Sequence, residues 1–68
     1  MANTVEGAIR KAKKHPAAIR DGAFTVVFDF VNLKYDWFPA SRGVPRGYSV
    51  YDRYRRNAAG KWEKVEEQ

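Results

Sequence analysis

The fold is decided by residues 23–30, which read AFTVVFDF. Phe24, Val26, Phe28 and Phe30 all fall on even positions, a period of two that is typical of a strand with one buried face. After Phe30 the apolar residues move to odd positions, from Val31 to Trp37. Because a shift of one residue turns every side chain to the opposite face, we expect a bulge or tight turn near residues 31–33. The pattern therefore predicts strands at about 23–30 and 34–38.

The residues before this strand predict a helix. Apolar residues recur at helical spacing from Val5 to Ala12, and Asn3 is a suitable N-terminal cap. Pro16 cannot donate a backbone hydrogen bond, so it interrupts the helix and can begin a further turn. We expect a helix over about residues 4–14, with a kinked extension to residue 20.

The residues after it predict two more strands, at about 48–56 and 61–65, joined by a hairpin loop at residues 57–60. Residues 39–47 hold two prolines and two glycines, which is typical of a loop. The sequence therefore predicts one small domain over residues 1–68, of the α+β class. An N-terminal helix would pack on a small antiparallel sheet of three to four strands, in the order α-β-β-β-β.

Composition excludes several classes of protein. The chain has 68 residues, of which 44% are hydrophobic and 15% aromatic, so we expect a folded domain with a thin core. The absence of cysteine excludes a disulfide framework, a thiolate zinc site and a cysteine nucleophile. No apolar run approaches the ~20 residues of a membrane span, and no signal-peptide pattern follows the start. We expect a cytoplasmic protein, in the host cytoplasm if it is phage-encoded, without a membrane partner.

The residue pattern also argues against an enzyme. The only histidine, His15, lies in the helix break with no nucleophile marked beside it, and we interpret it as a surface or capping residue. Ser41 and Ser49 lie in no nucleophile motif, and the carboxylates are scattered. We expect no catalytic residue, no metal site, no cofactor and no small-molecule substrate.

The charge is uneven. The net charge is +5, and two basic blocks, residues 1–20 and 42–56, each hold five basic residues against one acidic residue. Clustered Lys and Arg attract polyanions such as nucleic acid. The alternative is a solvated surface that keeps a small protein soluble. Whether the two blocks share one surface stays open.

The C-terminal hairpin suggests where nucleic acid would bind. If Arg56 pairs with Lys61, then Arg55 opposes Trp62 on a face that mixes aromatic and basic side chains. Rings can stack on bases while cations neutralise phosphates. The alternative is a structural cation–π pair of Arg55 with Trp62, and a one-residue slip would remove the face. The candidate nucleic-acid-binding residues are Arg10, Lys11, Lys13 and Lys14 on the helix, and Tyr51, Arg53, Arg55, Trp62 and Lys64 on the hairpin.

A second set of residues suggests a protein partner. Ten aromatic residues are many for a sheet with one covered face, so part of the stretch from Tyr35 to Phe38 is expected to be exposed. Prolines stiffen the loop that carries two arginines, which lowers the entropy cost of docking. The candidate partner-binding residues are Tyr35, Trp37, Arg42 and Arg46.

Residues 37–39, WFP, followed by residues 44–50, VPRGYSV, resemble the core of the MbtH-like proteins, small activators of adenylating enzymes. The chain differs from that family in lacking a C-terminal helix and in carrying its helix at the other end. In type, a small basic chain without cysteine also resembles phage-encoded inhibitors such as anti-CRISPR proteins and polymerase inhibitors.

Two functions follow as hypotheses. The first is a small non-enzymatic protein that binds nucleic acid, DNA or RNA, through phosphates and with weak sequence preference. The second is a phage-type inhibitor or adaptor that binds a host protein which itself binds nucleic acid. A homodimer is possible under either.

Overall fold

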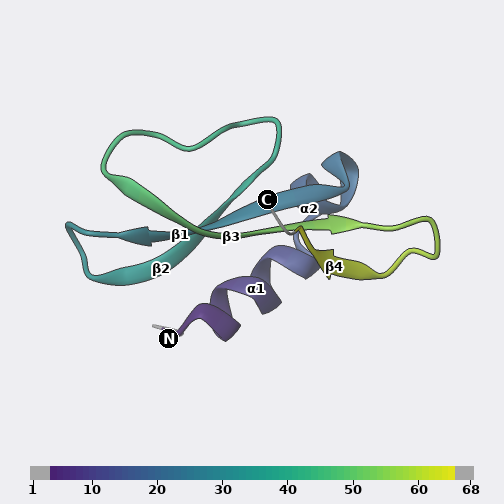
Figure 1. Ribbon diagram of the computed structural model, residues 1–68, viewed down its shortest axis with the longest axis horizontal. Coiled ribbons are helices and arrows are strands. Elements are labelled where there is room, and N and C mark those ends of the chain that lie inside the picture. The colour runs from purple at the N-terminus through teal and green to yellow at the C-terminus, as the bar shows by residue number, and fades with distance from the viewer. Residues whose placement is uncertain (1–3, 66–68) are drawn as a thin grey trace.

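In a computed structural model, a helix lies across one face of a four-stranded antiparallel sheet, with a second short helix where the first strand begins (Figure 1). The structure describes residues 4–65. In chain order the elements are α1 (Val5–Lys14), α2 (Pro16–Asp21), β1 (Ala23–Asp29), β2 (Lys34–Pro39), β3 (Tyr48–Arg56) and β4 (Trp62–Lys64). The strand order in the sheet is β2-β1-β3-β4. The predicted α+β class and element order are confirmed, with boundaries that differ by at most one residue.

Side-chain caps fix both helices. The Thr4 hydroxyl accepts a hydrogen bond from the Gly7 N–H at 3.1 Å and caps α1, whereas the expected cap, Asn3, lies outside the described residues. His15 ends α1 and begins α2, where its Nδ1 accepts a hydrogen bond from the Ala17 N–H at 3.1 Å. Pro16 follows at the first helical position, where an N–H has no partner in any case. The His15 imidazole therefore caps α2 and stabilises the kink between the two helices.

Small residues on α1 let it approach the sheet closely. Ala8 and Ala12 are buried and form one cluster with Phe24 and Val26 of β1. The Phe24 ring lies 6.3, 5.2 and 5.0 Å, between ring centroids, from three further rings. We call these four residues the aromatic layer: Phe24, Trp37, Tyr54 and Trp62. Burial of the Tyr54 side chain in this layer, with the Asp52 carboxylate nearby, raises the pKa of its phenol.

The predicted tight turn joins β1 to β2. Phe28 pairs with Tyr35, and Val26 with Trp37, so even positions on β1 share a face with odd positions on β2. The Asp29 carboxylate builds the turn. Its Oδ1 accepts the N–H groups of Val31 and Asn32 at 2.9 and 3.3 Å, and its Oδ2 accepts the Asn32 side-chain amide at 2.8 Å.

A β-bulge in β3, which the sequence analysis did not predict, sets the faces of the longest strand. Val26 pairs with Asp52, but Val27 pairs with Val50, so Tyr51 is an extra residue. Its ring lies 5.3 Å from that of Tyr35, on the side of the sheet that α1 covers. The predicted common face of Tyr51 and Arg53 is therefore wrong.

Within residues 4–65, none of the helices has the length and apolar character needed to cross a membrane.

Replacing Phe24 by leucine should lower the free energy of unfolding by about 1–2 kcal/mol, because the side chain is 1% exposed and three ring contacts would be lost. Urea unfolding measures this loss. Phe30→Leu is the matched control, since Phe30 is 61% exposed, and should change stability by less than about 0.5 kcal/mol. Equal losses in both variants would contradict the assigned core.

The turn at Asp29 makes a pH-dependent contribution to stability. The Asn32 side-chain amide, helped by the N–H groups of Asn32 and Val31, holds the pKa of the Asp29 carboxyl below its usual 3.8, although burial opposes this. A carboxyl whose pKa is lower in the folded state stabilises the fold above its unfolded pKa. That contribution disappears as the pH falls through the folded value.

Asp29→Asn should therefore be less stable than the natural chain at neutral pH, because two amide N–H groups would face each other at Asn32. The difference should shrink as the pH falls below about 4, where the carboxyl of the unfolded chain begins to be protonated, and should disappear once the pH has fallen through the lower folded pKa. Urea unfolding at a series of pH values measures both. A stability difference that stays constant down to about pH 2 would show that the carboxylate does not hold the turn.

Candidate nucleic-acid interface

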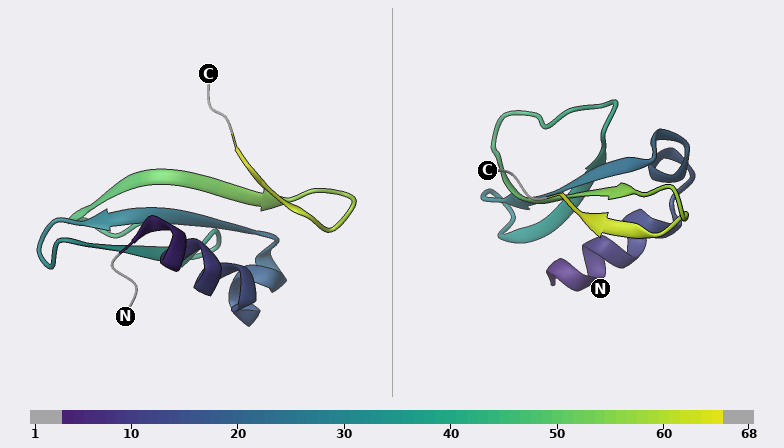
Figure 2. Two further views of the ribbon diagram at one scale, coloured as in Figure 1. Left: turned by 90° about the horizontal axis from the view of Figure 1, so that it is seen from below. Right: turned by 45° about the vertical axis from the view of Figure 1, so that its right-hand side comes forward.

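The sheet has two unlike faces. The aromatic layer lies on the face that α1 covers, which we call the helix face. Residues 40–47, the loop between β2 and β3, rise over the opposite face, which we call the loop face (Figure 2). Strand pairing places on the loop face Thr25, Val27, Phe38, Tyr48, Val50, Arg53 and Arg55.

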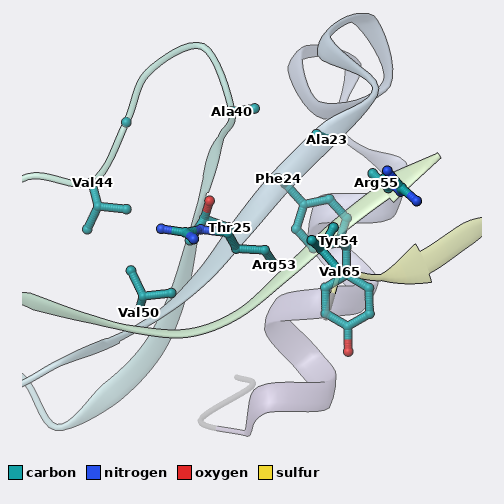
Figure 3. A pocket seen from close by; sticks show the side chains of 11 residues that line it. Ala23, Phe24, Thr25, Ala40, Val44, Val50, Arg53, Tyr54, Arg55 and Val65 are labelled. Carbon is teal, nitrogen blue, oxygen red and sulfur yellow. The ribbon is translucent and has the colours of Figure 1, made fainter. Parts of the chain in front are cut away.

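A groove of about 520 Å³ lies between this loop and the sheet. Its loop side is formed by Ala40, Gly43 and Val44, and its floor includes Thr25 and Val50. Figure 3 shows the Arg53 side chain lying between the strand and the loop, with its nitrogens toward Val44. The groove therefore combines an apolar wall with a guanidinium group and a hydroxyl. Its further lining residues are Ala23, Phe24, Tyr54, Arg55 and Val65.

Hydrogen bonds fix the base of this loop. The Asp21 carboxylate accepts the Ser41 hydroxyl at 2.6 Å and the Ser41 N–H at 3.1 Å. The Ala40 N–H donates to the Ala23 carbonyl at 3.2 Å. The Ser41 hydroxyl, with its N–H, lowers the pKa of the Asp21 carboxyl, so the carboxylate stays ionised and keeps its bonds at neutral pH. The start of the groove wall is thus tied to the end of α2.

Two rings and an arginine extend the loop face beside the groove. The rings of Phe38 and Tyr48 come from the two strands that flank β1, and their centroids lie 5.0 Å apart. They meet across β1, and Val27, which faces the same side, is fully buried. The Arg42 guanidinium lies 5.7 Å from the centre of the Phe38 ring. The loop face therefore offers rings and cations together.

The predicted pairing of β3 with β4 is wrong by one residue. Arg56 pairs with Trp62, not with Lys61, and Arg55 pairs with Glu63. The predicted mixed face is consequently divided between the two sides of the sheet. Arg53 and Arg55 lie on the loop face, while Tyr51, Trp62 and Lys64 lie on the helix face.

The hairpin loop explains this register. Asn57 closes the loop, since its N–H donates to the Lys61 carbonyl at 2.8 Å. Its side-chain oxygen accepts the N–H groups of Ala59 and Lys61 at 2.9 and 3.0 Å, and Gly60 adopts a φ of 79° that suits glycine. Asn57 and Lys61 therefore close the turn around residues 58–60, in place of the predicted Arg56–Lys61 pair around residues 57–60. The new register also places the Trp62 ring against Phe24.

The observed register also gives the charged side chains of the hairpin different partners from those predicted. The Arg56 guanidinium, not that of Arg55, lies over the Trp62 ring, 5.9 Å from its centre. Arg55 instead pairs with the Glu63 carboxylate at 3.4 Å, and Lys64 pairs with that of Asp52 at 3.3 Å. Both ion pairs are partly exposed to solvent, so their effect on stability is small.

The two basic blocks do not form one surface. The helix residues Arg10, Lys11, Lys13 and Lys14 are exposed on α1, in the layer on the far side of the sheet from Arg53 and Arg55 (Figure 2). The structure thus brings the predicted nucleic-acid residues together as two separate groups. A short ligand would contact only one of them.

The predicted partner-binding residues are also separated. Trp37 is half-buried, with its ring 5.0 Å from the His15 ring and 6.3 Å from the Phe24 ring. Tyr35 is half-buried as well, whereas Arg42 and Arg46 are exposed on the loop. The sequence pattern predicted no binding role for Thr25, Phe38 or Tyr48. Their place beside the loop arginines follows from the strand register.

Comparisons of the chain with protein-family models, curated proteins and solved structures find no match. Residues 4–65 contain no group of three His, Asp or Glu residues that could hold a metal ion.

Proposed function

We propose that this protein is a non-enzymatic nucleic-acid-binding protein that uses its loop face. The observation that carries the proposal is the grouping of cations and rings on one face: Arg53 and Arg55 line the groove, and Arg42 lies beside it with the rings of Phe38 and Tyr48. We place the protein in the cytoplasm and expect it to need no cofactor and no small-molecule substrate.

Each group has a distinct part in binding. The guanidinium groups neutralise phosphates and donate paired hydrogen bonds to their oxygens. The Thr25 hydroxyl can donate to a phosphate or sugar oxygen, and the exposed parts of the rings offer surfaces for base stacking. Because no element within residues 4–65 resembles a recognition helix that reads base edges in the major groove, sequence preference should be weak.

The loop face fits this role better than the outer surface of α1. The α1 surface also carries four cations, but α1 itself contains no aromatic residue. It supplies long-range attraction for a polyanion and little else. On the loop face the same kind of charge lies beside a recess and two rings.

The geometry also ranks this proposal above a phage-type inhibitor of a host protein. That hypothesis uses Tyr35 and Trp37 as exposed anchors, but the Trp37 ring packs in the aromatic layer. Arg42 and Arg46 serve either hypothesis, since both are exposed on the loop.

Arg53→Ala with Arg55→Ala should weaken oligonucleotide binding and reduce the slope of log affinity against log salt by about 1–2. The slope falls because binding releases fewer counterions from the nucleic acid when fewer phosphates are neutralised. Fluorescence anisotropy with short single- and double-stranded oligonucleotides, at about 50 and 200 mM salt, measures both quantities.

Lys13→Ala with Lys14→Ala is the matched control, because it removes the same charge from the other layer. This pair should leave the slope nearly unchanged. If the lysine pair reduces the slope and the arginine pair does not, the interface lies on α1 and the assignment to the loop face is wrong.

A further inference from the structure

The apex of the β1–β2 hairpin exposes a group of apolar side chains. Phe30, Val31 and Leu33 are 61%, 82% and 71% exposed. They follow one another around a turn that forms one end of the molecule (Figure 1). An apolar group of this size at an apex is unusual in a monomer that has no partner for it.

A row of rings continues this apolar surface onto the helix face. The centroids of Phe30 and Phe28 lie 5.3 Å apart, those of Phe28 and Tyr35 lie 5.2 Å apart, and those of Tyr35 and Tyr51 lie 5.3 Å apart. Tyr51 is 51% exposed, so α1 leaves this end of the face partly uncovered. We call the whole surface the hairpin patch: Phe28, Phe30, Val31, Leu33, Tyr35 and Tyr51.

Hydrogen bonds fix the conformation of the hairpin apex. The Asp29 carboxylate accepts three hydrogen bonds from the turn, so the N–H groups of Val31 and Asn32 already have partners. Burying them against another surface would leave neither donor unpaired. Leu33 adopts a φ of 52°, which is strained for a side chain of this kind. Such strain persists only where the surrounding structure fixes the conformation of the residue.

We propose that the hairpin patch is the interface of a symmetric dimer of this chain. The patch contains both a projecting part, the apex, and a flatter part, the row of rings, and the two are adjacent. In a two-fold arrangement the apex of each copy can lie over the rings of the other. One chain thereby supplies both halves of the contact.

Charged side chains at the edge of the hairpin patch could also pair between two copies of the chain. Lys34, directly after the apex, is exposed, and Glu6 is exposed in the first turn of α1. The N-terminal end of α1 lies toward the hairpin end of the molecule (Figure 1). A two-fold axis can bring Lys34 of one copy to Glu6 of the other. An anionic lipid surface would attract Lys34 and repel Glu6.

The size of the patch sets the expected affinity. A stable specific interface buries about 800 Å² of each partner, and the whole chain exposes only 5012 Å². Four of the six side chains in the patch are more than half exposed, and six are fewer than the roughly 20–30 residues that each partner of a standard interface contributes, so the dimer should form and dissociate at concentrations on the order of micromolar to tens of micromolar. The hairpin patch shares no residue with the lining of the groove, so dimerisation should leave the groove of each copy accessible.

Sedimentation velocity of the full chain between about 5 and 500 µM tests the proposal, since the fraction of dimer depends on concentration. The mass should rise from 7.8 kDa toward twice that value. Val31→Ser with Leu33→Gly should weaken the association at least about tenfold. Glycine at position 33 relieves the positive φ, so the fold is preserved.

Ile19→Ser is the matched control, because Ile19 is 44% exposed on α2, outside the hairpin patch, and its change should leave the association constant unaltered. A mass that stays at 7.8 kDa over the whole range would overturn the proposal. So would equal association of the double variant and the natural chain. Binding of a monomeric chain to phosphatidylcholine–phosphatidylserine vesicles through the same residues would assign the patch to a membrane instead.

Discussion

The contact between the small side chains of α1 and the Phe24 ring is the interaction on which the rest of the structure depends. Ala8 and Ala12 are short enough for the helix to lie close to β1, where Phe24 joins the rings of Trp37, Tyr54 and Trp62 into one layer. Phe24, Val26 and Val27 are the largest fully buried side chains, and the other three rings of the aromatic layer pack, partly buried, against this core. The contact also determines which face of the sheet is covered by α1.

Two local features then determine the surfaces that are available for binding. The bulge at Tyr51 turns that ring toward Tyr35 on the helix face and leaves Arg53 on the opposite side. The Asn57 turn gives the β3–β4 hairpin a register in which Trp62 enters the aromatic layer and Glu63 pairs with Arg55. Together they separate a ring-and-arginine surface on the loop face from an apolar surface at the hairpin end. The proposed nucleic-acid surface and the proposed dimer surface are thus formed by different side chains.

The elements of the fold could be predicted from the sequence because their signals are local. The period of two in residues 23–30, its change of phase after Phe30, and Pro16 each act over a few neighbouring residues. The candidate interface could not be predicted in the same way. Its register depends on whether Asn57 or Arg56 closes the hairpin, and no composition signal distinguishes them. The bulge depends on contacts of Tyr51 with a strand distant in the chain. A one-residue error at either place moves side chains to the wrong face.

We propose that the loop face, and not α1, contacts nucleic acid. Amide chemical-shift mapping by NMR, during titration with a short single-stranded oligonucleotide, distinguishes these two surfaces. We expect the largest shifts at Thr25, at Arg53 and along residues 40–47, with small shifts along residues 10–14. Large shifts along residues 10–14, with the loop and β3 unchanged, would contradict it.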